Sequence, residues 1–277
     1  MGCGPVSSHV LFDAPGPKAR RRSLIFSIIS LVIVAAIVLW AILTLAAPRQ
    51  SSGIALPGSF DPSRWDIFTD PRVWRDIGLG ALATLEAAAV AAVLALAIGI
   101  AFSILRTSAS AWVRLPATVV LEFFRGMPVL LLMLFILLAS SFGAFWAVVL
   151  GLAVYNGAII GEILRAGIVS LPRGQREAGL SLGLTHLQTK SFIEYPQAFR
   201  QMLPVIVAQL VVLLKDTSLG YIVGCNELIR TTMNNMLSFY GNRYQLSLFI
   251  VTLVIYLAIN LSLSAVARRL ARRRPVR

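Results

Sequence analysis

The chain alternates long apolar stretches with short polar ones, and this alternation predicts its main structural elements. A membrane helix needs about 20 mainly apolar residues to cross a hydrocarbon core of roughly 30 Å. Six stretches meet this requirement, so the pattern predicts an all-α polytopic membrane protein. The expected transmembrane helices are Ser23–Ala47, Leu82–Leu105, Ala117–Ser140, Ala144–Gly167, Leu203–Gly224 and Gln245–Ala267.

The composition agrees with a membrane protein and argues against a nucleic-acid-binding one. Of the 277 residues, 57% are hydrophobic and only 13% are charged, whereas soluble domains contain about 25% charged residues. The net charge of +13 would suit phosphate binding. However, the Lys and Arg residues lie in short segments between apolar runs, without interleaved aromatic residues. Membrane lipid is therefore the expected surrounding, and no nucleic-acid partner is expected.

The distribution of basic residues predicts the orientation. Cytoplasmic segments of membrane proteins carry an excess of Lys and Arg. With the N-terminus inside, 17 of the 25 basic residues fall on the cytoplasmic side and six on the other. Arg125 and Lys215 lie within predicted spans. We expect a multi-pass protein of a bacterial plasma membrane, with two cytoplasmic tails, residues 1–22 and 268–277.

The segment between the first two spans, residues 48–77, is expected to lie outside the membrane. Pro48, Pro57, Pro62 and Pro71 should interrupt any long helix there. Aromatic side chains recur among its charged residues, which favours a segment at headgroup level. Docking of an external partner is the alternative.

The longest predicted cytoplasmic loop, residues 168–202, contains a spaced motif made of Glu177-Ala178-Gly179, Gly183, Ile193 and Pro196. A short helix is expected over Gly174–Leu184, with a tight turn at Gly183. The loop resembles the coupling loop of ABC importer permeases, whose pattern is EAA, three residues, G, nine residues and I-x-L-P. In this chain Gly179 replaces the second Ala and Tyr195 replaces the Leu. The positions that would couple the permease to its ATPase are Glu177, Ala178, Gly179, Gly183, Ile193 and Pro196.

Flanking segments extend the resemblance to the polar amino-acid branch of these permeases. They are Glu122–Pro128, Tyr155–Arg165 and Leu214–Leu219, and the similarity covers residues 78–267. It implies a five-helix importer core, to which residues 23–47 add one helix. The opening stretch Val10–Pro17 is similar to the glutamate-uptake branch.

The resemblance also implies the partners. These are two ABC ATPase subunits, a second permease copy or a related permease, and an external amino-acid-binding protein. The chain contains no P-loop of the form G-x-x-x-x-G-K-[ST]. We therefore expect a non-catalytic subunit with no cofactor of its own, and ATP and Mg in the partner ATPase. His9 and His186 have no ligand partners at metal spacing, so no metal site is expected.

Polar side chains inside the predicted spans are candidates for the substrate path. An ionisable group at the centre of a membrane helix costs about 2.5–3.5 kcal/mol on insertion scales. An amino acid carries an ammonium group, which Asp216 could bind, and a carboxylate, which Arg125 or Lys215 could bind. Pairing between helices is the alternative, with near-equal weight for Glu122 and Arg125, whose i, i+3 spacing also suits a pair with each other. The candidates are Asp216, Gln209, Thr217, Ser218, Lys215, Arg125 and Glu122.

The predicted function is that of a permease subunit which imports polar amino acids, with glutamate as the expected cargo, by alternating access. Glutamine, arginine or histidine are alternative cargoes. An ion-coupled secondary transporter is a second class, in which Asp216 and Glu122 would relay ions. A membrane-embedded enzyme is a third class, for which the sequence supplies no nucleophile–base set.

Overall fold

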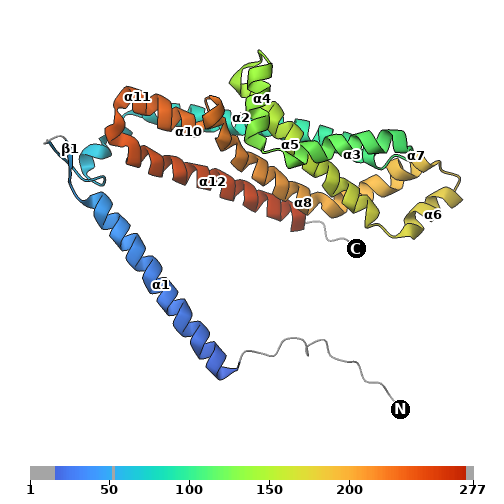
Figure 1. Ribbon diagram of the computed structural model, residues 1–277, viewed down its shortest axis with the longest axis horizontal. Helices are drawn as coiled ribbons and strands as arrows, with labels where there is room; N and C mark the ends of the chain where they lie inside the picture. Colours follow the sequence, from blue (N-terminus) through green and yellow to red (C-terminus); the bar gives the residue numbers. More distant parts are fainter. Residues whose placement is uncertain (1–15, 52–53, 273–277) are drawn as a thin grey trace. The chain divides into compact units, whose positions relative to one another are not determined.

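A computed structural model describes residues 16–51 and 54–272 of the chain. Most of the Val10–Pro17 stretch and half of the six C-terminal arginines lie outside these residues. The described chain forms two units, which divide after Trp65 (Figure 1). The main helices and strands are α1 (Pro17–Ala46), β1 (Arg49–Ser51), β2 (Ile54–Leu56), α2 (Pro71–Arg106), α3 (Ala111–Gly126), α4 (Val129–Ala139), α5 (Gly143–Val169), α6 (Arg173–Ser181), α7 (His186–Thr189), α8 (Tyr195–Asp216), α9 (Gly220–Val223), α10 (Leu228–Arg230), α11 (Leu237–Tyr240) and α12 (Gln245–Arg272).

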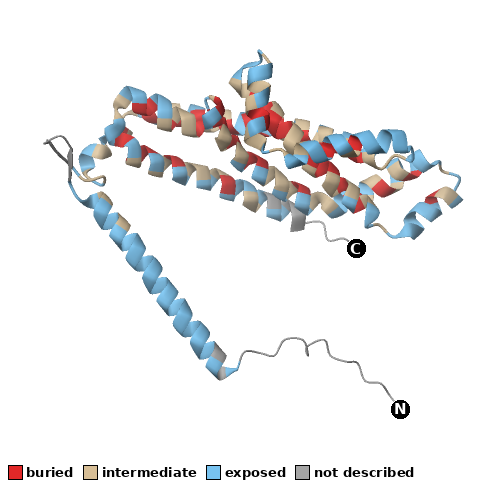
Figure 2. Ribbon diagram, viewed as in Figure 1, coloured by how far each residue is buried: buried red, intermediate tan, exposed pale blue. Residues whose placement is uncertain are grey.

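The first unit consists of α1 and a small hairpin. The expected first span is present, and its helix starts earlier, at Pro17, where a proline at the first helical position needs no backbone partner. Its large apolar side chains are exposed along the helix (Figure 2). The antiparallel strands β1 and β2 pair Arg49 with Leu56 and are an addition to the expected all-α fold.

The second unit is built around the pairing of α2 with α5. Small residues on both helices allow a close approach, as is usual between membrane helices. A Cβ atom on Gly99 would lie 2.6 Å from Ile160, and one on Gly157 would lie 2.6 Å from Ile98. The buried positions include Ala91, Ala95 and Gly99 on α2 and Gly157 and Gly161 on α5. This closely packed pair of helices therefore forms the centre of the unit.

Helix α2 starts eleven residues before the expected span. The side chain of Asp70 caps it by accepting a hydrogen bond from the Arg72 backbone at 2.9 Å. Pro71 occupies the first turn, where its missing N–H has no helical partner to lose. No helix runs through Pro71, as expected, but residues 71–77 were not expected to be helical and belong to α2, because this proline begins a helix.

The expected continuous helix over Ala117–Ser140 is instead two helices. α3 and α4 are bent by 103° at Met127 and Pro128. The residue before a proline is driven out of the helical region, and Met127 is extended. Within the described residues, five helices are long and apolar enough to cross a membrane, and the bent pair meets the same criterion only jointly. The polytopic, predominantly helical class is confirmed.

The last two spans are longer than expected. α8 begins at Tyr195 rather than at Leu203, and a 3-10 turn over Thr217–Leu219 joins it to α9. α12 begins at Gln245 as expected and extends to Arg272. The polar segment that precedes α8 is also mostly helical: it contains α6, α7 and a π-helical turn over Lys190–Glu194. This segment is the loop described next.

Candidate functional site

The predicted short helix of the polar loop is present as α6. It ends where Gly183 adopts a left-handed backbone with a φ of +79°. In this turn the backbone N–H of Leu184 donates to the carbonyl of Gly179 at 3.2 Å. Glycine reaches this conformation without a steric penalty. The motif glycine therefore reverses the chain between α6 and α7.

Gly179 fixes α6 against the segment before α8. A Cβ atom on Gly179 would lie 2.8 Å from Thr189 and 2.9 Å from Ile193. Gly179 is buried, whereas Glu177 and Ala178 on the same helix are exposed. Two motif residues, Gly179 and Ile193, thus hold the loop together, and two others present a carboxylate and a small side chain to the outside.

The segment after α6 is ordered by its own cap. The Thr185 hydroxyl accepts from the Gln188 backbone, and the Gln188 side chain accepts from the Thr185 backbone at 2.9 Å. Two leucines flank this cap, and they remain exposed at 81% for Leu182 and 75% for Leu187. Pro196, which is also exposed, lies in the first turn of α8. The loop is a structured projection that carries apolar side chains on its surface.

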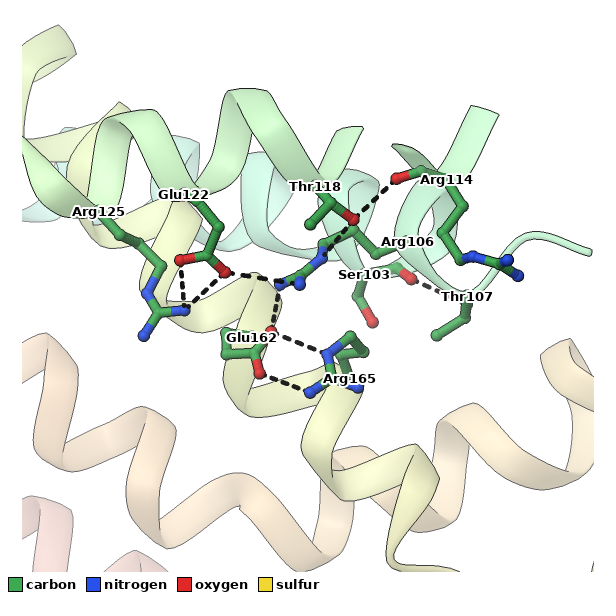
Figure 3. Close-up of polar contacts among 9 residues, drawn as sticks. All are labelled: Ser103, Arg106, Thr107, Arg114, Thr118, Glu122, Arg125, Glu162 and Arg165. Carbon is green, nitrogen blue, oxygen red and sulfur yellow. Dashed lines mark hydrogen bonds and ion pairs between the residues drawn. The ribbon is translucent and has the colours of Figure 1, made fainter. Parts of the chain in front are cut away.

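Five charged residues beside this loop form a continuous network between three helices (Figure 3). Arg106, at the end of α2, contacts Glu162 on α5 and lies 3.5 Å from Glu122 on α3. Arg125 donates to Glu122 at 3.2 Å, and Arg165 donates to Glu162 at 2.6 Å. Each carboxylate thus meets two guanidinium groups. The network joins the ends of α2, α3 and α5 electrostatically.

The i, i+3 pairing of Glu122 with Arg125 agrees with the sequence-based alternative of a structural pair. Arg106, which contacts Glu122, and Glu162, which contacts Arg106, were not expected from the sequence to join this pair. Glu162 and Arg165 share the i, i+3 spacing that singled out the other pair, which was an available signal. Arg106 reaches Glu162 only because α2 packs against α5. The spacing of residues along one helix gives no information about such a contact.

The end of α8 carries the other candidate polar residues. The Thr217 hydroxyl donates to the Leu214 carbonyl at 2.7 Å, and the Ser218 hydroxyl donates to the Lys215 carbonyl at 2.8 Å. Tyr256 of α12 donates to the same two carbonyls, each at 2.9 Å. These bonds stabilise the backbone where the α-helix gives way to the 3-10 turn over Thr217–Leu219.

Lys215 is exposed at this position, and Asp216 is half-buried. The ion pairs found within residues 16–51 and 54–272 include neither of them. Asp216 is the last residue of the regular α-helix, so the two charged groups stand where the helix changes its geometry.

Gln209 lies two turns before Asp216 and has a protein partner. Its side-chain amide donates to the Asn156 side chain on α5 at 2.8 Å, and Asn156 in turn donates to the Leu152 carbonyl. Asn156 is fully buried, so this bond satisfies a polar group inside the bundle. Gln209 therefore connects α8 to α5 directly.

Comparison with known proteins agrees with this architecture. Residues 94–275 match the family described as the binding-protein-dependent transport system inner membrane component. The chain is 39% identical to the glutamate transport system permease protein GluD of Corynebacterium glutamicum over 78% of this chain and 81% of that one. It is 34% identical to the probable glutamine ABC transporter permease protein GlnP of Bacillus subtilis, over 69% and 90% of the two chains.

A solved structure, described as that of an amino acid ABC transporter with histidines, has a TM-score of 0.66 and 27% identity. The match covers 73% of this chain and 96% of that one. The fold and site thus define a multi-pass membrane protein of the ABC permease class. The chain belongs to the family of binding-protein-dependent transport system inner membrane components. The resemblance to amino-acid ABC permeases is confirmed.

Proposed function

We propose that this chain is the membrane-spanning subunit of an ATP-driven importer of polar amino acids, with glutamate as its cargo. The 39% identity with a glutamate transport permease supports the choice of cargo. The glutamine permease at 34% identity makes glutamine the principal alternative. Because the sequence contains no P-loop, ATP and Mg²⁺ belong to a separate ATPase subunit.

The exposed face of α6 is the proposed contact with that ATPase. The exposure of its motif residues is the main structural support for the proposed function. Glu177 and Ala178 are exposed on a short helix that Gly179 anchors to Ile193. A partner that moves α6 therefore also moves the segment leading into α8. Two ATPase subunits, a second permease and an external binding protein complete the proposed assembly. Both chain termini are cytoplasmic in this arrangement.

Asp216 and Lys215 are the residues that best suit contact with the cargo. They offer one carboxylate and one ammonium group, and neither is used in the ion pairs of the described residues. An amino acid presents the complementary pair of charges. Glu122, Arg125 and Gln209 have protein partners, so we assign them to positioning the helices instead.

Uptake in right-side-out membrane vesicles tests the proposal. The permease is produced with its ATPase and binding protein, and labelled glutamate uptake is measured with ATP inside the vesicles. Uptake should require ATP, and excess unlabelled glutamate should suppress it more than glutamine or arginine does. Uptake driven by a proton gradient without ATP would instead support a secondary transporter. Stronger suppression by glutamine would reassign the cargo.

A further inference from the structure

Two adjoining cavities lie beside the coupling loop. The smaller, of about 300 Å³, is lined by residues near the ends of α2 and α5 and by residues of α6. The larger, of about 900 Å³, is lined by residues from the end of α2, the start of α3 and the segment from α7 into α8. Thr107, Ser108 and Lys190 line both cavities. The two therefore meet along a shared boundary and can hold one extended molecule.

The smaller cavity has a strong excess of positive charge. Six cationic side chains line it, against one carboxylate, that of Glu194. Arg106 and Arg165 are paired with Glu162, so their charge is largely offset. The remaining four are Arg114, Arg173, Arg176 and Lys190. Figure 3 shows the guanidinium group of Arg114 pointing away from the ion-pair network. This cavity suits an anionic group.

The larger cavity is mainly apolar. Ile100, Ile104, Val113 and Phe199 line it, and its lining contains no Asp or Glu. The side chains of Ile100 and Ile104 are exposed, although they belong to a helix that is long and apolar enough to cross a membrane. Such a surface suits a hydrocarbon chain.

Aromatic residues place these cavities at the edge of the membrane. Tyr195 lines the larger cavity, and Trp112, at the start of α3, is 91% exposed. Tyr and Trp side chains concentrate at the headgroup level of membranes, where they span the apolar and polar regions. A cationic cavity that adjoins an apolar groove at this level has the two parts that an anionic lipid requires.

We propose that the two cavities together bind one anionic phospholipid. Its phosphate occupies the cationic cavity near Arg114 and Lys190, and an acyl chain lies along the apolar groove. The Lys190 ammonium group donates to the Thr107 carbonyl, which holds it at the junction of the two cavities. Free phosphate would leave the apolar groove unfilled, so the lipid is the better fit. The proposal depends on membrane insertion and is independent of the cargo.

Native mass spectrometry of the purified full-length chain tests this site. The protein is equilibrated with equal amounts of phosphatidylglycerol and phosphatidylcholine, and the ratio of the two retained lipids is measured. Phosphatidylglycerol should be preferred, and each of Arg114→Gln and Lys190→Gln should lower the preference about five-fold. Lys190→Arg should retain it. Ser191→Trp, which fills the larger cavity without changing charge, should reduce retention of both lipids.

Arg268→Gln is the matched control, because Arg268 is an exposed basic residue that lines neither cavity. An equal loss of the phosphatidylglycerol preference in this variant would show that anionic lipid is attracted to basic residues anywhere on the surface, and it would overturn the proposal. Displacement of the lipid by inorganic phosphate would also overturn it, as would displacement by the partner ATPase, which would make the cavities a subunit interface. The measurement uses the permease alone, so its failure leaves the proposed import function intact.

Discussion

Gly179 on α6 lies so close to Ile193 that a Cβ atom at residue 179 would be 2.9 Å from the Cδ1 atom of Ile193. These two residues are separated by a reversal of the chain at Gly183, which has a positive φ. The contact therefore packs α6 directly against the segment that leads into α8. This packing is the physical basis for the proposed transmission of movement from α6 to α8.

Enlarging Gly179 should disrupt this contact. Gly179→Val adds two methyl groups beyond a Cβ that already lies 2.8 Å from Thr189, so overpacking should destabilise the loop by about 1–3 kcal/mol. Thermal unfolding of the purified chain and co-purification with the ATPase measure the effect. Gly174→Val is the control, because a Cβ on Gly174 meets nothing within 4 Å. Equal losses in both variants would contradict the packing role.

Reversing the charge of Glu177 should separate coupling from folding. Glu177 is exposed, so Glu177→Lys should leave membrane insertion and thermal stability within about 0.5 kcal/mol of the wild type. ATP-dependent uptake should be lost and co-purification with the ATPase weakened, because the proposed contact would bear the opposite charge. Ser181→Lys, at another exposed position of the same helix, controls for an added positive charge. Normal uptake by Glu177→Lys would remove this residue from the contact.

The ion-pair network allows the same substitution to be compared at two exposures. Arg106 is 10% exposed and touches two carboxylates, so Arg106→Gln should cost about 2 kcal/mol of stability. Arg125 is 36% exposed and its partner Glu122 is 51% exposed, so Arg125→Gln should cost at most about 1 kcal/mol. Thermal unfolding in detergent gives both values. The reverse order would show that Arg106 is not the centre of the network.

The sequence predicted the helices that depend on local pattern better than those that depend on packing. α5 was expected within two residues of its observed ends, because its apolar run coincides with its helix. α2 and α8 extend well beyond their apolar runs: Asp70 caps the polar start of α2, and at the polar start of α8 the Tyr195 hydroxyl donates to the Ser103 hydroxyl of α2. The bend at Met127 and Pro128 was not predicted, because the hydrophobic pattern continues across Pro128 and favoured one span.

The candidate site was predictable in its local parts. The short helix, its terminating glycine and the pairing of Glu122 with Arg125 follow from spacing alone. Asn156, which pairs with Gln209, and Arg106, which contacts Glu162, each lie more than 50 residues from their partner in the chain, so spacing along one helix could not identify these two contacts. Long-range contacts of this kind depend on which helices pack together.

Neutralising Asp216 should reduce transport more than assembly. Asp216→Asn keeps the size of a half-buried side chain and removes the charge proposed to meet the cargo's ammonium group. Glutamate uptake should fall at least ten-fold, with unchanged recovery of the permease–ATPase complex. Thr217→Val is the contrasting variant, because the Thr217 hydroxyl bonds to the helix backbone, and its main effect should be on stability. Loss of the complex in Asp216→Asn would make Asp216 structural.

Glu227 should make stability depend on pH. Its side chain is 1% exposed and accepts hydrogen bonds from the Ile229 and Arg230 backbones, and burial raises its pKa from 4.5 to about 6. Between these values the folded chain binds more protons than the unfolded chain, so stability falls as the pH rises. The fall should total about 2 kcal/mol over the whole titration, from well below pH 4.5 to well above pH 6. In Glu227→Gln this component should disappear, because the amide does not titrate; its single oxygen accepts only one of the two backbone bonds, so this variant should also be less stable at every pH. Unfolding free energies of both proteins across this range test the assignment, and parallel curves would refute it.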